Sequence, residues 1–181
     1  MLIYNNMKEN FLNTIKNHID NEGYHLTIVT GNNALPRYAY TIGFKEVFNF
    51  EIVFAGAEYY TKDEIKVIIE NLFNSFNKGV DWRNLELDLG ELGIFTLSLA
   101  HSSWSKLMLL GVWDYYKTID LEVLQVIPNK KYYTLDIPNM LVEYNPLKPD
   151  VADLQSVTFH NEQYCDQKIL SFIKIKNVHK V

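Results

Sequence analysis

The sequence of 181 residues contains a single cysteine, Cys165, which excludes an intramolecular disulfide and a cysteine-rich zinc site. Long apolar runs are also missing, and the longest apolar patches are far shorter than a membrane-spanning helix requires. The first residues lack the basic segment and the long apolar segment of a signal peptide. These absences predict a soluble protein in a reducing, cytoplasmic compartment that is not inserted in a membrane.

Basic charge is scarce as well. The chain has 17 Lys and Arg against 22 Asp and Glu, a formal net charge of -5, and no basic block. Because nucleic-acid binding without sequence preference needs a footprint of lysine and arginine, that class of function is excluded. Glycine-rich phosphate loops are missing too, which excludes nucleotide binding through those motifs. The acidic balance suits a basic protein partner, and it equally suits plain solubility.

The residues that are present favour one well-packed domain, since 48% are apolar and 14% aromatic. Their patterns predict an α+β fold, with a mostly antiparallel sheet of five or six strands and helices packed on one face. The strand with apolar residues on both faces after Glu51 is expected in the centre of the sheet. The expected strands are 24–30, 38–42, 50–56, 94–99 and 121–127, the last ended by Pro128. The expected helices are 7–21, one from the cap Thr61 to Gly79, and one from Ser102 or Ser103 to Tyr115, which Gly111 weakens.

The chain divides into a core domain, 1–144, and a small C-terminal appendage, 145–181. Pro146 and Pro149 mark the linker between them. Within the appendage, 154–159 is a candidate strand, and the stretch around 169–175 is amphipathic.

The best candidate ligand-binding residues are Arg37, Tyr38, Tyr40, Thr41 and His101. Strand alternation places the two tyrosines on one face and Arg37 and Thr41 on the other. Paired tyrosine rings that still offer hydroxyls suit either a pocket wall or a core lining. His101 precedes two serines at a helix start, where it faces an anion or simply caps the helix.

No catalytic or metal-ligating set is predicted. The five histidines lack the i, i+4 or His-x-His spacing of a metal site, and His18 and His25 are expected at the surface or at a strand edge. Cys165 and His160 form a conceivable nucleophile and base, but they carry no recognised signature. We therefore expect no catalytic residue and no cofactor.

The segment Tyr38–Gly43, preceded by Gly23, Tyr24 and His25, resembles the bacterial family known as domain of unknown function 4262. Leu124–Ile127 matches a late strand of the same family. The resemblance covers roughly residues 23–139. Family members often carry His-Pro before the glutamate where this chain has Asn49 and Phe50, and Tyr133 replaces the tryptophan of a late turn, or that residue is lost. The family has no established activity, so the resemblance bears on fold and bacterial origin and not on mechanism.

The first functional hypothesis is a non-enzymatic bacterial interaction protein, for instance an immunity protein that neutralises a basic toxin. It rests on the lack of a catalytic set, the acidic balance and the many aromatics suited to an interface. The alternative is a small-ligand-binding protein or enzyme with a pocket near Tyr38, Tyr40 and His101. A homodimer that uses an exposed sheet edge is a third hypothesis.

Overall fold

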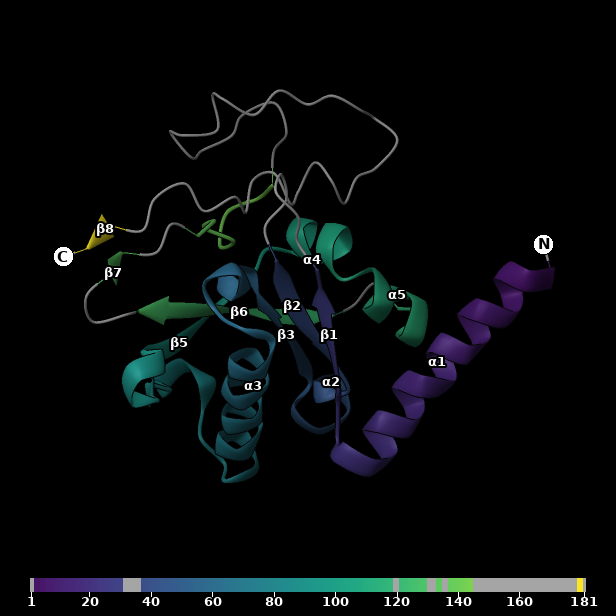
Figure 1. The fold of residues 1–181 in the computed structure, drawn as a ribbon, viewed down its shortest axis with the longest axis horizontal. Helices are drawn as coiled ribbons and strands as arrows, with labels where there is room; N and C mark the ends of the chain where they lie inside the picture. Colours follow the sequence, from purple (N-terminus) through teal and green to yellow (C-terminus); the bar gives the residue numbers. More distant parts are fainter. Residues whose placement is uncertain are drawn as a thin grey trace.

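The computed structural model describes residues 2–30, 37–118, 121–129, 133–134, 137–144 and 179–180. Six strands form one sheet in the order β1-β2-β3-β6-β5-β4 (Figure 1). All neighbouring strands are antiparallel except β3 and β6, which are parallel. The predicted α+β fold and mostly antiparallel sheet are therefore confirmed. The strands are β1 (His25–Val29), β2 (Tyr38–Ile42), β3 (Phe50–Phe54), β4 (Leu87–Asp88), β5 (Ile94–Leu99) and β6 (Glu122–Asn129).

Helix α3 (Lys62–Asn77) begins directly after its predicted cap, Thr61, whereas α1 (Leu2–Glu22) begins before residue 7, where it was expected. In α3 the Thr61 hydroxyl accepts from the Glu64 N–H and the Glu64 carboxylate accepts from the Thr61 N–H, which completes the predicted capping box. No helix in the described part of the chain is long and apolar enough to cross a membrane. The helices are α1 (Leu2–Glu22), α2 (Phe44–Phe48), α3 (Lys62–Asn77), α4 (Ser102–Met108) and α5 (Leu110–Tyr116), with short 3-10 helices η1 (Ala55–Tyr59), η2 (Trp82–Asn84) and η3 (Gly90–Leu92).

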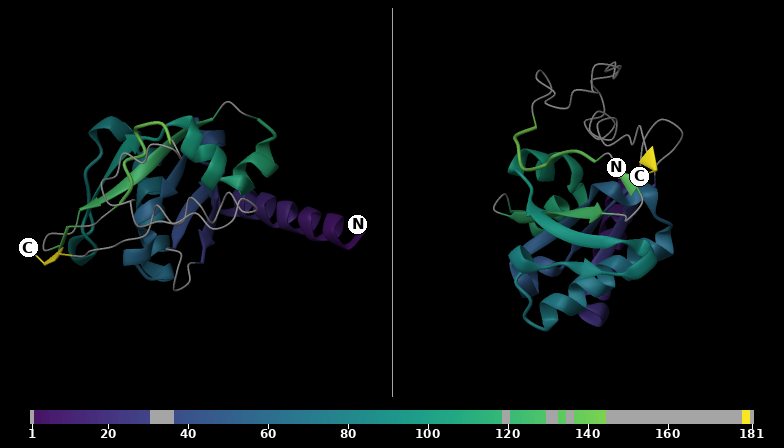
Figure 2. Two further views of the ribbon diagram at one scale, coloured as in Figure 1. Left: turned by 90° about the horizontal axis from the view of Figure 1, so that it is seen from above. Right: turned by 90° about the vertical axis from the view of Figure 1, so that its left-hand side faces the viewer.

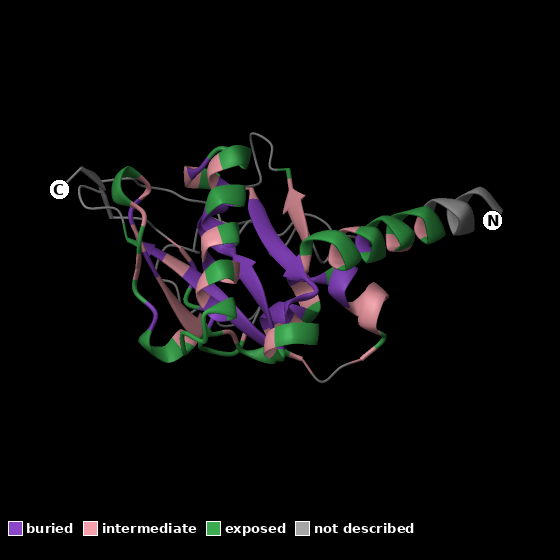
Figure 3. Cartoon of the chain, turned by 90° about the horizontal axis from the view of Figure 1, so that it is seen from below, coloured by how far each residue is buried: buried purple, intermediate pink, exposed green. Residues whose placement is uncertain are grey.

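The helices cover both faces of the sheet, which corrects the expectation that they pack on one. On one face, α3 packs against a cluster that contains Ile52 and Phe54 of β3. On the other face, α1, α4 and α5 pack against Val53 of β3 and Val123 of β6. A central strand with apolar residues of both parities needs cover on both sides, and Figure 3 shows the middle strands buried between the two layers. The central position predicted for the third strand is confirmed.

The helix expected from Ser102 or Ser103 to Tyr115 is two helices. His101 is the N-cap, and the chain leaves helical geometry at the fully buried Leu109 before α5 begins. Gly111 lies inside α5, where a Cβ would stand 2.7 Å from the Tyr40 hydroxyl. This glycine is therefore explained by the close approach of α5 to β2.

Strand β6 continues through Pro128 to Asn129 instead of ending at the proline. Pro128 pairs with Phe95 of β5, whereas β3 pairs only with residues from Glu122 to Gln125 of β6. Proline lacks an N–H, so it is tolerated where one side of a strand has no neighbour.

Beyond the main sheet, β7 (Tyr133–Thr134) pairs with β8 (His179–Lys180) as a separate two-stranded sheet. The predicted linker prolines, the strand 154–159, the stretch 169–175, His160 and Cys165 all lie outside the described residues, as does the turn at 31–33.

Candidate functional site at the edge strand β1

The two predicted tyrosines lie in the core between β2 and the α4–α5 layer. Tyr38 and Tyr40 are 4% and 5% exposed. The Tyr38 hydroxyl donates to the Met108 carbonyl at 3.0 Å, and the Tyr40 hydroxyl accepts from the Gly111 N–H at 3.3 Å. Both hydroxyls thus tie α4 and α5 to the sheet, which corresponds to the core-lining alternative that the sequence left open.

The other three predicted residues, Arg37, Thr41 and His101, lie in three different environments. The Arg37 guanidinium donates to the Tyr60 carbonyl at 2.7 Å, and its Nε is buried without a hydrogen-bond partner among the described residues. Thr41 is buried and donates to Glu51. His101 is exposed, and its Nδ1 accepts from the Ser103 N–H at the start of α4. The structure does not bring His101 together with the tyrosines.

Glu51, which sequence reasoning did not select, is fully buried in β3. One carboxylate oxygen accepts from the Thr41 hydroxyl at 2.6 Å. The other accepts from the Gly43 N–H at 2.8 Å, the Lys45 N–H at 3.2 Å and the Tyr116 hydroxyl at 3.0 Å. This network joins β2, β3, α5 and the first turn of α2.

Burial raises the pKa of the Glu51 carboxyl, and the hydrogen bonds from Thr41, Gly43, Lys45 and Tyr116 oppose that rise. With no exposed surface and four donors already in place, the carboxylate has no access to a substrate. Its position holds the turn at Gly43, whose φ of +119° favours glycine. The sequence signal for Glu51 was a lone carboxylate inside an otherwise apolar strand.

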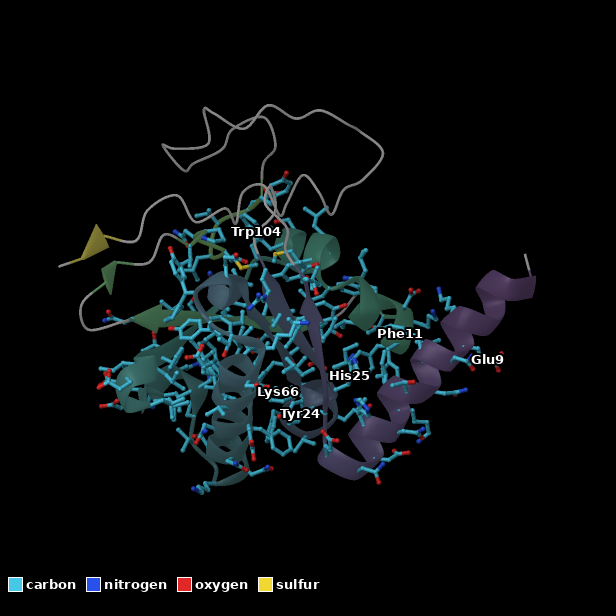
Figure 4. All side chains as sticks on the ribbon, in the orientation of Figure 1. Glu9, Phe11, Tyr24, His25, Lys66 and Trp104 are labelled. Atoms are coloured by element: carbon cyan, nitrogen blue, oxygen red, sulfur yellow. The ribbon has the colours of Figure 1, made fainter. Side chains whose placement is uncertain are left out.

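A groove of about 580 Å³ lies beside β1. The side chains of Leu26 and Ile28 in β1 face α3. His18 and Glu22, near the C-terminal end of α1, line the other side of the groove. Figure 4 shows Tyr24 and Lys66 on the α3 side and His25 on the side of α1. We call this opening the β1 groove, and its lining residues are His18, Glu22, Tyr24, Leu26, Ile28, Lys66, Glu70, Phe73 and Asn74.

The β1 groove has an apolar floor and an acidic end. Tyr24 packs on Phe73 with ring centroids 5.0 Å apart. Burial raises the pKa of the Tyr24 hydroxyl to about 12, and the negative charges of Glu70 and Glu22 add to that rise. Lys66 is the one basic lysine or arginine side chain among the lining residues. The potential around Tyr24 therefore favours a cation.

His25 points to the other side of β1, where it meets His18, a residue that also lines the groove. Their Nδ1 atoms are 2.8 Å apart, and their ring centroids are 4.9 Å apart. The predicted edge position of His25 is confirmed, because β1 is an edge strand. The sequence did not predict their pairing, because it depends on the turn at Gly23 that brings α1 back along β1. The spacing rules for histidine pairs do not cover such a turn. Among the described residues, no group of three or more His, Cys, Asp or Glu could hold a metal ion.

Comparisons with protein-family models, with curated proteins and with solved structures find no match. The resemblance to the domain of unknown function 4262 family stays a prediction.

Proposed function

We propose that this protein is a binding module that takes up an extended, basic segment of a protein partner as an additional strand along β1. The observation that carries the proposal is the β1 groove of about 580 Å³ beside the strand that forms one edge of the sheet in the described part of the chain. The immunity protein with a basic toxin partner is one specific form of this function.

The edge strand β1 is suited to pairing with another chain. An edge strand presents unpaired N–H and C=O groups, and proteins usually protect such edges with lysine, proline or very short strands. β1 has five residues and contains neither lysine nor proline. The opposite edge strand, β4, has only two residues. Addition of a strand to an exposed sheet edge is a common mode of peptide recognition.

The β1 groove also constrains the side chains of the partner. Alternate residues of an added strand would point towards α3. There they meet the apolar surface of Leu26, Ile28 and Phe73, or the acidic end where Glu22 and Glu70 flank Tyr24. A segment that alternates apolar and basic residues matches both regions by hydrophobic burial and charge complementarity.

The test is a selection of random twelve-residue peptides on the full-length protein at pH 7.5. We expect enrichment of extended sequences with lysine or arginine next to apolar residues. Backbone amide shifts on binding should concentrate in β1, α3 and the end of α1. The double variant Glu22→Lys/Glu70→Lys should weaken binding at least about tenfold, which equals about 1.4 kcal/mol.

The matched control is Glu86→Lys/Glu91→Lys, which makes the same charge change with two exposed residues near the opposite sheet edge. It should bind the selected peptides like the wild type. The proposal is overturned if no peptide is selected, if amide shifts map elsewhere, or if both double variants weaken binding equally. A stable dimer paired through β1 would likewise replace the proposed partner by a second copy.

A small molecule is the second candidate occupant, because the groove volume lies within the range of about 300–1,000 Å³ seen for ligand pockets. Mass spectrometry of the purified protein under native conditions tests it. A bound small molecule that blocks peptide uptake would favour this second function.

A further inference from the structure

The His18–His25 contact is a polar link between α1 and β1. His18 lies in the C-terminal half of α1, and His25 opens β1. With Nδ1 atoms 2.8 Å apart, one ring must donate its N–H and the other must accept with a lone pair. Phe11 of α1 packs its ring at right angles to His25, at 6.2 Å between centroids. The contact therefore depends on the protonation of both rings.

Three protonation states follow from this geometry. Two neutral rings form the hydrogen bond when one ring carries its proton on Nδ1 and the other carries it on Nε2. When one ring is protonated on both nitrogens, its Nδ1–H donates to the Nδ1 lone pair of the neutral ring. When both rings are charged, two N–H donors and two positive charges face each other at the same short distance. This third state has no hydrogen bond and strong repulsion.

The surroundings do little to neutralise the second charge. Burial and the charge of His18 lower the pKa of His25, and only Glu22 acts on it in the opposite direction. Around His18, the groove places the charged groups Glu22, Lys66 and Glu70. The positive charge of Lys66 thus partly balances the negative charges of Glu22 and Glu70. His25 itself packs against the ring of Phe11.

A second polar anchor of α1 does not titrate in the same range. Lys8 Nζ lies 2.6 Å from the Asp114 carboxylate of α5. That hydrogen bond lowers the pKa of Asp114 below its ordinary value of 3.8, so the ion pair persists at pH 5. The ion pair of Lys16 with Asp20 lies within α1 and does not hold the helix to the sheet. Between pH 7.5 and pH 5, the histidine contact is the polar anchor that changes.

We propose that the His18–His25 contact is a pH-sensitive latch that holds α1 against β1 near neutral pH and releases it when both rings are protonated. After release, the apolar contacts of the C-terminal half of α1 would remain, such as those of Ile15, which is fully buried. The N-terminal part of α1 already projects from the body of the molecule, as Figures 1 and 2 show. His18 also lines the β1 groove, so the latch is tested on the protein alone, with no partner present.

The test is hydrogen exchange of α1 and β1 amides in the full chain at pH 7.5 and pH 5.0, corrected for the intrinsic pH dependence of exchange. We expect at least tenfold faster exchange in residues 12–22 at pH 5.0 than at pH 7.5, while α3 changes little. In His25→Phe, which keeps an aromatic ring but cannot titrate, this difference should disappear. The control His101→Asn removes a histidine elsewhere and keeps a capping side chain, so it should behave like the wild type.

A second variant, His18→Phe, removes the other ring, and it decides the question if His25→Phe does not fold. Nitrogen-15 spectra of the imidazoles provide an independent readout, with one Nδ1 protonated and the other not at pH 7.5. The latch is refuted if wild-type α1 exchanges equally fast at both pH values. It is also refuted if the phenylalanine variants accelerate as much as the wild type, or if neither Nδ1 carries a proton at pH 7.5.

Discussion

Replacement of Glu51 tests whether one buried carboxylate holds the centre of the fold. Glu51→Leu removes the acceptor of four donors: the Thr41 and Tyr116 hydroxyls and the Gly43 and Lys45 N–H groups. Lys45 and Tyr116 are half-buried, so water can reach their donors. The Thr41 and Gly43 donors are fully buried, and each unsatisfied buried group costs about 1–3 kcal/mol.

Two such groups predict a loss of about 2–6 kcal/mol for Glu51→Leu, a large part of the roughly 5–15 kcal/mol that stabilises an ordinary domain. Glu51→Gln should cost much less. Its amide oxygen still accepts from Gly43, Lys45 and Tyr116, and its NH₂ group can donate to Thr41 Oγ1, which already accepts from the Ile52 N–H. Urea unfolding followed by tryptophan fluorescence measures both variants.

The same pair of proteins tests the direction of the pKa shift. Because burial raises the pKa of Glu51 above 4.5, the folded state binds its proton more tightly than the unfolded state. This contribution to stability is fully present below pH 4.5 and is lost as the pH rises through the folded pKa. Glutamine cannot titrate, so the wild type should gain stability relative to Glu51→Gln between pH 8 and pH 4.5. A pH-independent difference, or a leucine variant as stable as the glutamine variant, would refute this reasoning.

Three further predictions concern the helices and the latch. Thr61→Ala should destabilise the protein by about 1 kcal/mol through loss of the capping box, and Thr61→Ser should retain most of it, as thermal unfolding can show. Gly111→Ala should cost about 1–3 kcal/mol because its Cβ meets the Tyr40 hydroxyl, and in a Tyr40→Phe background that cost should vanish in a double-mutant cycle. The stability contributed by neutral His25 should be present above pH 6.5 and be lost as the pH falls through its lowered pKa, which His25→Phe should abolish.

Local signals in the sequence were enough to predict most of the elements. The capping box before α3 needs only Thr61 and Glu64, which are three residues apart. Strands β1 and β2 correspond to two alternating runs, 24–30 and 38–42, and the structure pairs His25 with Ile42. Both features depend on neighbours in the chain, and such neighbours are visible in a single sequence.

The candidate site could not be predicted in the same way, because its parts are distant in sequence. Tyr38 is ambiguous in the sequence because the carbonyl that accepts a hydrogen bond from its hydroxyl belongs to Met108, 70 positions later. Glu51 meets Tyr116 across 65 positions, and the β1 groove needs α3 to lie beside Leu26. Alternation shows which strand residues share a face of the sheet, but it does not show which helix covers that face.

Strand β1 presents different residues to the groove and to α1, and variants of these residues distinguish the binding proposal from the latch proposal. Tyr24, Leu26 and Ile28 face the groove and α3, whereas His25 faces α1, because side chains alternate along the strand. Glu22 acts on both Tyr24 and His25, so its substitution perturbs both systems. Glu70 acts on Tyr24, and it lines the groove together with His18. Glu70→Lys alone should therefore weaken the uptake of basic peptides. His25→Phe should leave peptide uptake at pH 7.5 unchanged and abolish the acid response of α1. If His25→Phe changed both responses, the two faces of β1 would act as one unit.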